Sequence, residues 1–232
     1  PSQRLAAGNF KLAGINVKDV VFGSFIQAVS SLSASSAVYF EMFINGRGNL
    51  AHGADASKTI GFLSEYVPVV IEVSEQQDTV AQLLFHKKQL DQILSFGVAF
   101  NAMKHMSEDA ATKQAFGRFA PPEFNLNFMP SALYDNAGDA GDATPGEGES
   151  PIPWHLLSIA PESPGRKDAP GVTDIIHASY ITISEVAGCY RIEFFFRDNV
   201  FAPKTVERLM DSWMQQIIRI VDDQRIIEVK NE

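Results

Sequence analysis

The chain has 232 residues, of which 45% are hydrophobic and 20% are charged, with 19 basic and 28 acidic side chains. This length and composition predict one globular domain with a sizeable core, or two small ones. The formal net charge is −9 and no run of three basic residues occurs, which argues against nucleic acid as a partner, because phosphate binding needs a clustered basic surface.

A single cysteine, Cys189, excludes an internal disulfide framework and a thiolate zinc site, so we expect a reducing, cytoplasmic setting. No apolar stretch is long enough to cross a bilayer, and the first thirty residues lack the order of a secretory signal. We therefore expect a soluble protein without a membrane partner. The chain begins at Pro1 rather than methionine, which suggests either a trimmed initiator or a piece of a longer protein.

The first half of the chain predicts helices and two strands. Helical spacing of apolar residues runs from Asn16 to Leu32, with Asn16 placed as N-cap and Asp19 in the first turn. Two β-rich apolar segments predict strands covered on both faces, namely Ala37 to Ile44 and Val67 to Val73. Three helices should follow, over Thr79 to Ser95, Val98 to about His105, and from a cap at Ser107 to Gly117.

The second half predicts strands and one long helix. Apolar and polar residues alternate from Glu123 to Phe128, which predicts a strand with one dry and one polar face. Ile175 to Glu185 and Cys189 to Arg197 face each other across a short turn as a hairpin. Pro203 opens a final amphipathic helix, while 135–151 and 161–171, poor in apolar residues, predict mobile loops.

Helices interleaved with about six strands predict an α/β fold, in which helices pack on a mixed β-sheet. Motifs for known chemistry are missing from the sequence. The five histidines are far apart and none belongs to a metal-binding motif, and no nucleophile elbow, Walker loop or dinucleotide-binding glycine motif occurs. We read Cys189 as a structural or idle thiol. Composition and motifs alone thus predict an α/β domain without a recognisable catalytic, cofactor or metal site.

Three blocks of sequence, in order, resemble motifs of one family. Phe43 to Arg47 followed by Ser57 to Val69 is similar to the pair "EGHGRE" and "SRTVGWFTSxYPV". Gly97 to Met106 is similar to "GIGYGLLRYL", and Pro122 to Phe128 to "PEVxFNYLGQF". These motifs belong to epimerization domains of nonribosomal peptide synthetases, members of the condensation-domain superfamily. The resemblance covers nearly the whole chain from about Asn16.

The resemblance implies a two-lobed fold in which the catalytic motif belongs to only one of the lobes. Condensation-type domains are V-shaped pairs of chloramphenicol-acetyltransferase-like lobes, and all three blocks belong to the C-terminal lobe. Residues 1–232 would then form a single lobe, and its partners would be the N-terminal lobe and a peptidyl carrier protein. In this family the reaction occurs in a tunnel between the lobes, to which the carrier's phosphopantetheine arm brings an aminoacyl or peptidyl thioester. The catalytic His-His-x-x-x-Asp-Gly motif belongs to the other lobe, so the isolated lobe should be inactive and bind no cofactor directly.

Two positions depart from the family pattern. Phe43 stands where "EGHGRE" has its first glutamate, and Leu126 stands where "FNYLGQF" has its tyrosine. The family is thought to place both groups at the epimerization centre, and an apolar residue cannot transfer a proton. Glu41 lies two residues before Phe43 and would project from the same face of a strand. It is either a displaced carboxylate or a structural acid.

Four residues are candidates for lining the cleft, and none is predicted to be catalytic. Asn45 and Arg47 lie in the first block, where Arg47 matches the arginine of "HGR", and Asn125 matches the asparagine of "FNY". Arg47 could equally form a structural ion pair at the end of a strand. Asn125 is expected on the polar face of its strand. Glu41, the displaced carboxylate, completes the set.

Three hypotheses about function stay open at this point. The first is a lobe of an epimerization-like domain that walls the tunnel and helps to receive the carrier protein. The second is a stand-alone, non-catalytic module that only binds carrier proteins. The third is part of an amide-forming condensation or acyltransferase domain, in which loss of the glutamate and tyrosine is expected. A homodimer, formed through an apolar face that the absent lobe leaves uncovered, is also open.

Overall fold

The computed structural model describes residues 10, 12, 14–46, 58–61, 63–73, 78–129, 178–186 and 189–226. The loops predicted at 135–151 and 161–171 lie outside these residues, as does Arg47.

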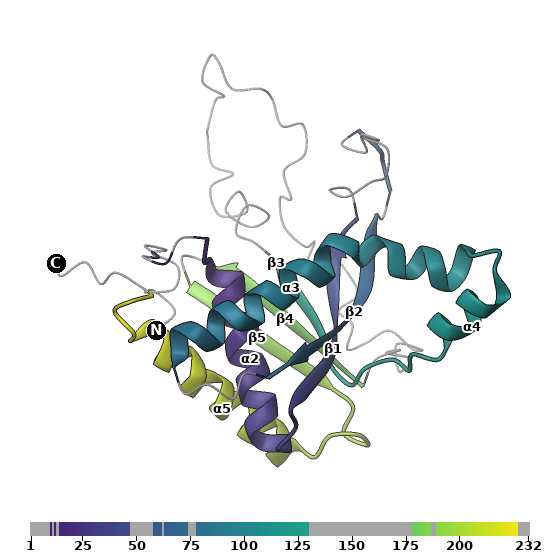
Figure 1. Ribbon diagram of the computed structural model, residues 1–232. Coiled ribbons are helices and arrows are strands. Elements are labelled where there is room, and N and C mark those ends of the chain that lie inside the picture. The colour runs from purple at the N-terminus through teal and green to yellow at the C-terminus, as the bar shows by residue number, and fades with distance from the viewer. Residues whose placement is uncertain are drawn as a thin grey trace, which may run out of the picture.

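A mixed β-sheet forms the centre of the described structure (Figure 1). Its five strands lie in the order β2-β1-β3-β4-β5, with β1 parallel to β3, β3 parallel to β4, and both outer pairs antiparallel. The strands are β1 (Ala37–Asn45), β2 (Ser64–Glu72), β3 (Asn125–Met129), β4 (Ser179–Val186) and β5 (Cys189–Phe196). The mixed sheet and the β4–β5 hairpin confirm the sequence prediction.

Three helices cover one face of this sheet and bury the core against it (Figure 1). These are α2 (Val17–Ser33), α3 (Thr79–Asn101) and α5 (Pro203–Val221), and α2 packs against both of the others. Trp213 of α5 is fully buried, stacks edge-on against Phe25 of α2 with ring centroids 4.9 Å apart, and donates its indole N–H to the Val21 carbonyl at 3.1 Å. Aromatic packing therefore joins the first and last helices of the fold.

Local signals predicted α2 and α5 correctly. Asn16 caps α2 in a reciprocal capping box, in which its side chain accepts the Asp19 N–H at 3.1 Å and Asp19 accepts the Asn16 N–H at 3.0 Å. α5 is amphipathic as predicted, with Pro203 in its first turn and an apolar stripe that is buried except at Met210, which is partly buried. None of the described helices is both long and apolar enough to cross a membrane.

The middle of the chain differs from the prediction. α3 runs without a break through Gly97 and continues as the π-helix η2 (Ala102–Met106), so the two helices expected here are one. A single glycine costs a helix only about 1 kcal/mol, which packing of α3 against β2 can outweigh. α4 (Ala110–Gly117) is capped by Asp109, whose carboxylate accepts the Thr112 N–H at 2.8 Å, and not by Ser107. The end of α3, η2 and α4 extend beyond the sheet (Figure 1).

β1 and β2 are not covered equally on both faces, which corrects a second prediction. The side chains that face the helices are buried, apart from Ile44 and Glu65 near the strand ends, whereas those of the opposite face are half-buried or exposed. β2 also begins at Ser64, three residues before the predicted start, and is the outer strand of the sheet. Pro68 is tolerated there because an edge strand leaves one side without ladder hydrogen bonds. The face of the sheet opposite the helices, called here the open face, is where the candidate site lies.

Candidate functional site

Glu41 and Asn125 come together on the open face. They are direct neighbours across the parallel β1–β3 pair, and the Asn125 Nδ2 group donates to Glu41 Oε2 at 3.3 Å. Asn125 is fully buried, and no described group donates to its Oδ1 atom. The amide of Asn125 therefore orients the Glu41 carboxylate, and its expected role in lining the cleft stays a prediction.

Asn45 does not join this pair. Asn45 is exposed at the end of β1, opposite Ser64 and four residues beyond Glu41 along the strand. Arg47 lies outside the described residues, so its expected place in the cleft stays a prediction.

Aromatic side chains occupy the place where the family motif has a glutamate. Phe43 is on the open face with Glu41, about 7 Å further along β1, and its ring lies 5.0 Å from that of Tyr66. Leu126, at the motif's tyrosine position, points the other way and is fully buried among the helices. Neither position can supply a proton-transferring group, and strand alternation explains why Leu126 cannot reach the open face.

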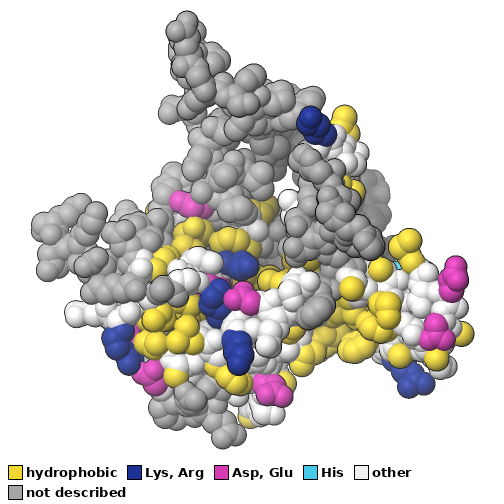
Figure 2. All heavy atoms as spheres, turned by 45° about the horizontal axis from the view of Figure 1, so that its top comes forward, with side chains coloured by type: hydrophobic (Ala, Val, Ile, Leu, Met, Phe, Trp, Pro, Cys, Tyr) yellow, Lys and Arg dark blue, Asp and Glu magenta, His cyan; other side chains and the backbone are white. Residues whose placement is uncertain are grey.

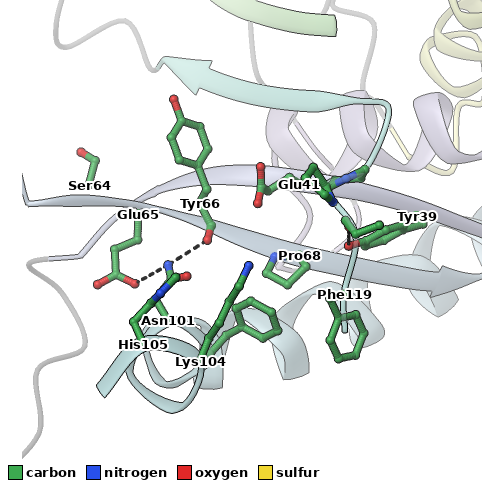
Figure 3. A pocket seen from close by; sticks show the side chains of 14 residues that line it. Tyr39, Glu41, Ser64, Glu65, Tyr66, Pro68, Asn101, Lys104, His105 and Phe119 are labelled. Carbon is green, nitrogen blue, oxygen red and sulfur yellow. Dashed lines mark hydrogen bonds between the residues drawn. The ribbon is translucent and has the colours of Figure 1, made fainter. Parts of the chain in front are cut away.

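The end of α3, η2 and α4 together are called here the helical extension. A cavity of about 600 Å³ lies between the sheet and this extension, and we call it the sheet–helix cavity (Figure 3). One wall is the open face of β1 and β2, and the other is the end of α3 with η2 and the segment 119–122. The lining residues are Tyr39, Glu41, Ser64, Glu65, Tyr66, Pro68, Phe100, Asn101, Lys104, His105, Phe119, Ala120, Pro121 and Pro122. Of the predicted site residues that the structure describes, Glu41 is thus the one that lines it.

Asn101 holds the helical wall against the sheet. Its Nδ2 group donates to Glu65 Oε2 at 3.1 Å and to the Tyr66 carbonyl at 3.0 Å (Figure 3). The π-helix begins at the next residue and places Lys104 and His105 on the cavity. A π-turn is an uncommon geometry that occurs often at functional sites. Gly97 to Met106 resembles a family motif, but the sequence analysis did not predict Asn101 or Lys104 as site residues. Two polar residues three positions apart in an otherwise apolar block could have indicated them.

Tyr39 is a neutral hydrogen-bond donor at the edge of the cavity. Its hydroxyl donates to the Ala120 carbonyl at 2.6 Å, which joins β1 to the segment before β3. Burial raises the pKa of Tyr39 above its ordinary value, and the negative charge of Glu41 raises it further. No group of three His, Cys, Asp or Glu side chains that could hold a metal occurs among the described residues.

Sequence comparison finds similarity to peptide synthetases. No family model matches the chain. It is 22% identical over 210 residues to a linear gramicidin synthase of Brevibacillus parabrevis, which covers 90% of this chain and 2% of that protein. It is 23% identical over 221 residues to bacitracin synthase 1 of Bacillus licheniformis, which covers 94% and 4%, respectively. The chain therefore spans only a small part of these curated relatives.

Structure comparison identifies the fold. The epimerization domain from the third module of tyrocidine synthetase B superposes with a TM-score of 0.65 at 19% identity, over 92% of this chain and 43% of that one. The first condensation domain of the calcium-dependent antibiotic synthetase superposes with a TM-score of 0.57 at 13% identity, over 99% and 44%. The chain has the fold of one lobe of a condensation-type domain. An acyltransferase, PapA2, matches this lobe with a TM-score of 0.57, in agreement with the predicted acetyltransferase-like half.

Proposed function

We propose that this chain forms the C-terminal wall of a reaction tunnel in a peptide synthetase, where it receives aminoacyl or peptidyl thioesters carried on phosphopantetheine. The observation that carries the proposal is the superposition on less than half of an epimerization domain, together with the cavity on the open face beside Glu41. Partial coverage supports a second lobe as the natural partner. A peptidyl carrier protein would supply the arm.

The lobe alone should be inactive. A general base must lie within hydrogen-bond reach of the proton that it removes. The carboxylate near the family position, Glu41, is held by Asn125 and is displaced from that position by two residues. The imidazole that the resemblance assigns to the tunnel belongs to the other lobe, and no His-His pair occurs in this sequence.

Amide formation or acyl transfer is the second candidate for the reaction of the intact enzyme, and Phe43 favours it over epimerization. An epimerase must remove and return a proton at Cα, whereas Phe43 packs on Tyr66 and brings no titratable group to that position. Leu126 lies on the wrong face of β3 to compensate. Phe43 in place of the motif's glutamate and Leu126 in place of its tyrosine are both expected in an enzyme that does not racemise its substrate.

The test compares this chain with a two-lobe protein. The coding sequence before Pro1 should encode a lobe with the His-His-x-x-x-Asp-Gly motif, and both lobes are expressed together. The two-lobe protein and the 232-residue chain are each incubated with aminoacyl holo carrier proteins. We expect new amide product, without racemised Cα, from the two-lobe protein only.

Three results would speak against parts of this proposal. Turnover by the chain alone would contradict the need for a second lobe. Racemised Cα from the two-lobe protein would restore epimerization as the reaction. Binding of holo carrier protein by the chain, with no encoded second lobe and no turnover, would favour the stand-alone module.

A further inference from the structure

Strand β5 is an outer strand of the described sheet, and an outer strand presents backbone donors and acceptors to a further strand. The Arg197 N–H donates to the Ala178 carbonyl at 3.0 Å, in continuation of the β4–β5 register. Because backbone groups alternate in direction along an antiparallel strand, every second residue before Arg197 also bonds to β4. The N–H and C=O groups of the residues between them, such as Ile192 and Phe194, therefore point away from the sheet.

The other outer strand, β2, is unsuited to pairing with a further strand. Pro68 lies in the middle of β2 and has no N–H group. Its nitrogen lies on the outer side, because Glu41, directly opposite, directs its own N–H away from β2 to the Phe124 carbonyl at 2.9 Å. A proline at the edge of a sheet hinders edge-to-edge pairing, and β5 contains none.

The charged side chains of β5 lie on the open face. Arg191 and Glu193 are both exposed, and neither forms an ion pair within the part of the chain that the structure describes. The residues opposite them on β4 are Ser184 and Thr182, which carry no charge. An added strand on the outer side of β5 can therefore supply the opposite charge to both residues.

This charge pattern is complementary to itself in one register. If β5 pairs antiparallel with β5 of a second copy about an axis through Ile192, Arg191 faces Glu193 of that copy and Glu193 faces its Arg191. These are non-hydrogen-bonded pairs, in which opposite side chains approach most closely. An axis through Arg191 or Glu193 would place like charges opposite each other, and an axis through Phe194 would place Arg191 opposite Arg197. Like charges directly opposite are destabilising, so the axis through Ile192 is favoured over these three.

The same register brings apolar side chains together. Ile192 would face Ile192 of the second copy on the helix side of the sheet, and Tyr190 would face Phe194. These side chains pack on the core but are only partly buried in the single chain. Phe195, which is 44% exposed, would lie opposite Cys189 on the open face. Pairing would therefore remove apolar surface from water in addition to joining charges.

We propose that two copies of this chain associate through β5, antiparallel about a two-fold axis at Ile192, to form one continuous sheet. The interface is isologous, since each copy offers the same Arg191 and Glu193 to the other. It lies at the edge of the sheet opposite β2, away from the sheet–helix cavity. It also differs from a dimer formed through an uncovered apolar face, because backbone hydrogen bonds and reciprocal ion pairs define it.

Sedimentation equilibrium of the 232-residue chain over a wide range of concentration tests the proposal. We expect a monomer–dimer equilibrium that weakens at high salt, because salt screens exposed ion pairs. Arg191→Glu and Glu193→Arg each place like charges opposite each other at both contacts, and each should raise the dissociation constant by about tenfold or more. An equimolar mixture of these two variants should associate again, because every facing pair is then of opposite charge. The double variant Arg191→Glu/Glu193→Arg should dimerise with itself for the same reason.

Matched controls reverse charges of the same kind elsewhere. Lys113→Glu on α4 and Glu207→Arg on α5 are at exposed positions and should leave the dissociation constant unchanged. Ile192→Pro removes an outward N–H without removing a hydrogen bond to β4, and it should abolish the dimer. Circular dichroism melting shows whether each variant folds. If Ile192→Pro does not, the charge reversals at Arg191 and Glu193, which leave the backbone unchanged, provide the test.

Amide hydrogen exchange measured by NMR locates the interface. The amides of Ile192 and Phe194 should exchange more slowly at high protein concentration than at low, because dimerisation gives them hydrogen-bond acceptors. A chain that stays monomeric at every concentration would overturn the proposal, as would a dimer that neither charge reversal weakens or two variants that fail to associate on mixing. A dimer with unchanged exchange at Ile192 and Phe194 uses another surface, such as an uncovered apolar face, and would overturn it as well.

Discussion

We expect His86 to make the stability of this lobe sensitive to mild acid. It lies on α3 with 1% of its surface exposed, in a small space between α2, α3 and α5. None of the other residues lining that space carries a charge; they are Gly23, Gln27, Thr79, Gln82, Leu83, Gln216 and Ile220. Burial lowers the pKa of His86 from 6.5 to about 4, because the protonated ring loses its hydration inside the fold.

The sign and size of the effect follow from this shift. The folded state favours the neutral ring, so the stability contributed by neutral His86 is fully present above pH 6.5 and is lost as the pH falls from 6.5 toward 4. A group shifted by this amount lowers the free energy of unfolding by roughly 2 kcal/mol at pH 5 and by about 3 kcal/mol at and below pH 4. At pH 7 the effect nearly vanishes.

The assay is urea unfolding at pH 7, 6, 5 and 4.5 for the wild type and for His86→Gln, which is neutral at every pH. The carboxylates whose pKa is lowered in the fold, Asp78, Asp109 and Asp223, are common to both proteins and cancel in the difference. We expect His86→Gln to lose most of the pH dependence between 7 and 5. His105→Gln, at an exposed position, should keep the wild-type dependence. Equal pH dependence in the wild type and His86→Gln would refute the reasoning.

Three further predictions concern the core, the site and a turn. Trp213→Phe removes two indole hydrogen bonds and buried volume, so urea unfolding should show a loss of about 2–4 kcal/mol, whereas exposed Met214→Ala should change stability by less than about 0.5 kcal/mol. Asn101→Ala removes the two hydrogen bonds from Asn101 to β2, and we expect a loss of about 1–2 kcal/mol with faster amide hydrogen exchange in η2, measured by mass spectrometry. Gly46→Ala would place a Cβ atom 2.6 Å from the Leu63 carbonyl oxygen, and thermal unfolding should show a loss of roughly 1–3 kcal/mol; an unchanged melting temperature would contradict that geometry.

The surface near the helical extension is unusually apolar for an exposed region. Hydrophobic side chains gather on the side of the molecule where α3 continues into η2 and α4 (Figure 2). Met103, Met106 and Phe119 are between 41% and 80% exposed there. This side is adjacent to the sheet–helix cavity, which Phe119 also lines.

Elements with a local periodic signal were predictable from the amino-acid sequence. The capping box at Asn16, the apolar stripe of α5 and the alternation along β3 each depend on residues close together in the chain. The helix predicted to end at Ser95 continues instead to Asn101. Gly97 weakens a helix only slightly, and the contacts of α3 with β2 involve residues too distant in sequence for local patterns to reveal. The prediction that β1 is covered on both faces was also wrong. Apolar residues on both faces of a strand do not reveal whether helices pack on one face or on two.

Long-range pairing decided the candidate site. Glu41 and Asn125 are 84 residues apart and meet only because β1 and β3 pair in one register, in which strand alternation also turns Leu126 away. Lys104 and Glu41 line the same cavity because of a π-turn and the anchor at Asn101, neither of which has a sequence period. Local propensity thus specified the helices and strands, whereas charge placement and desolvation of side chains such as His86 arose only when distant segments packed together.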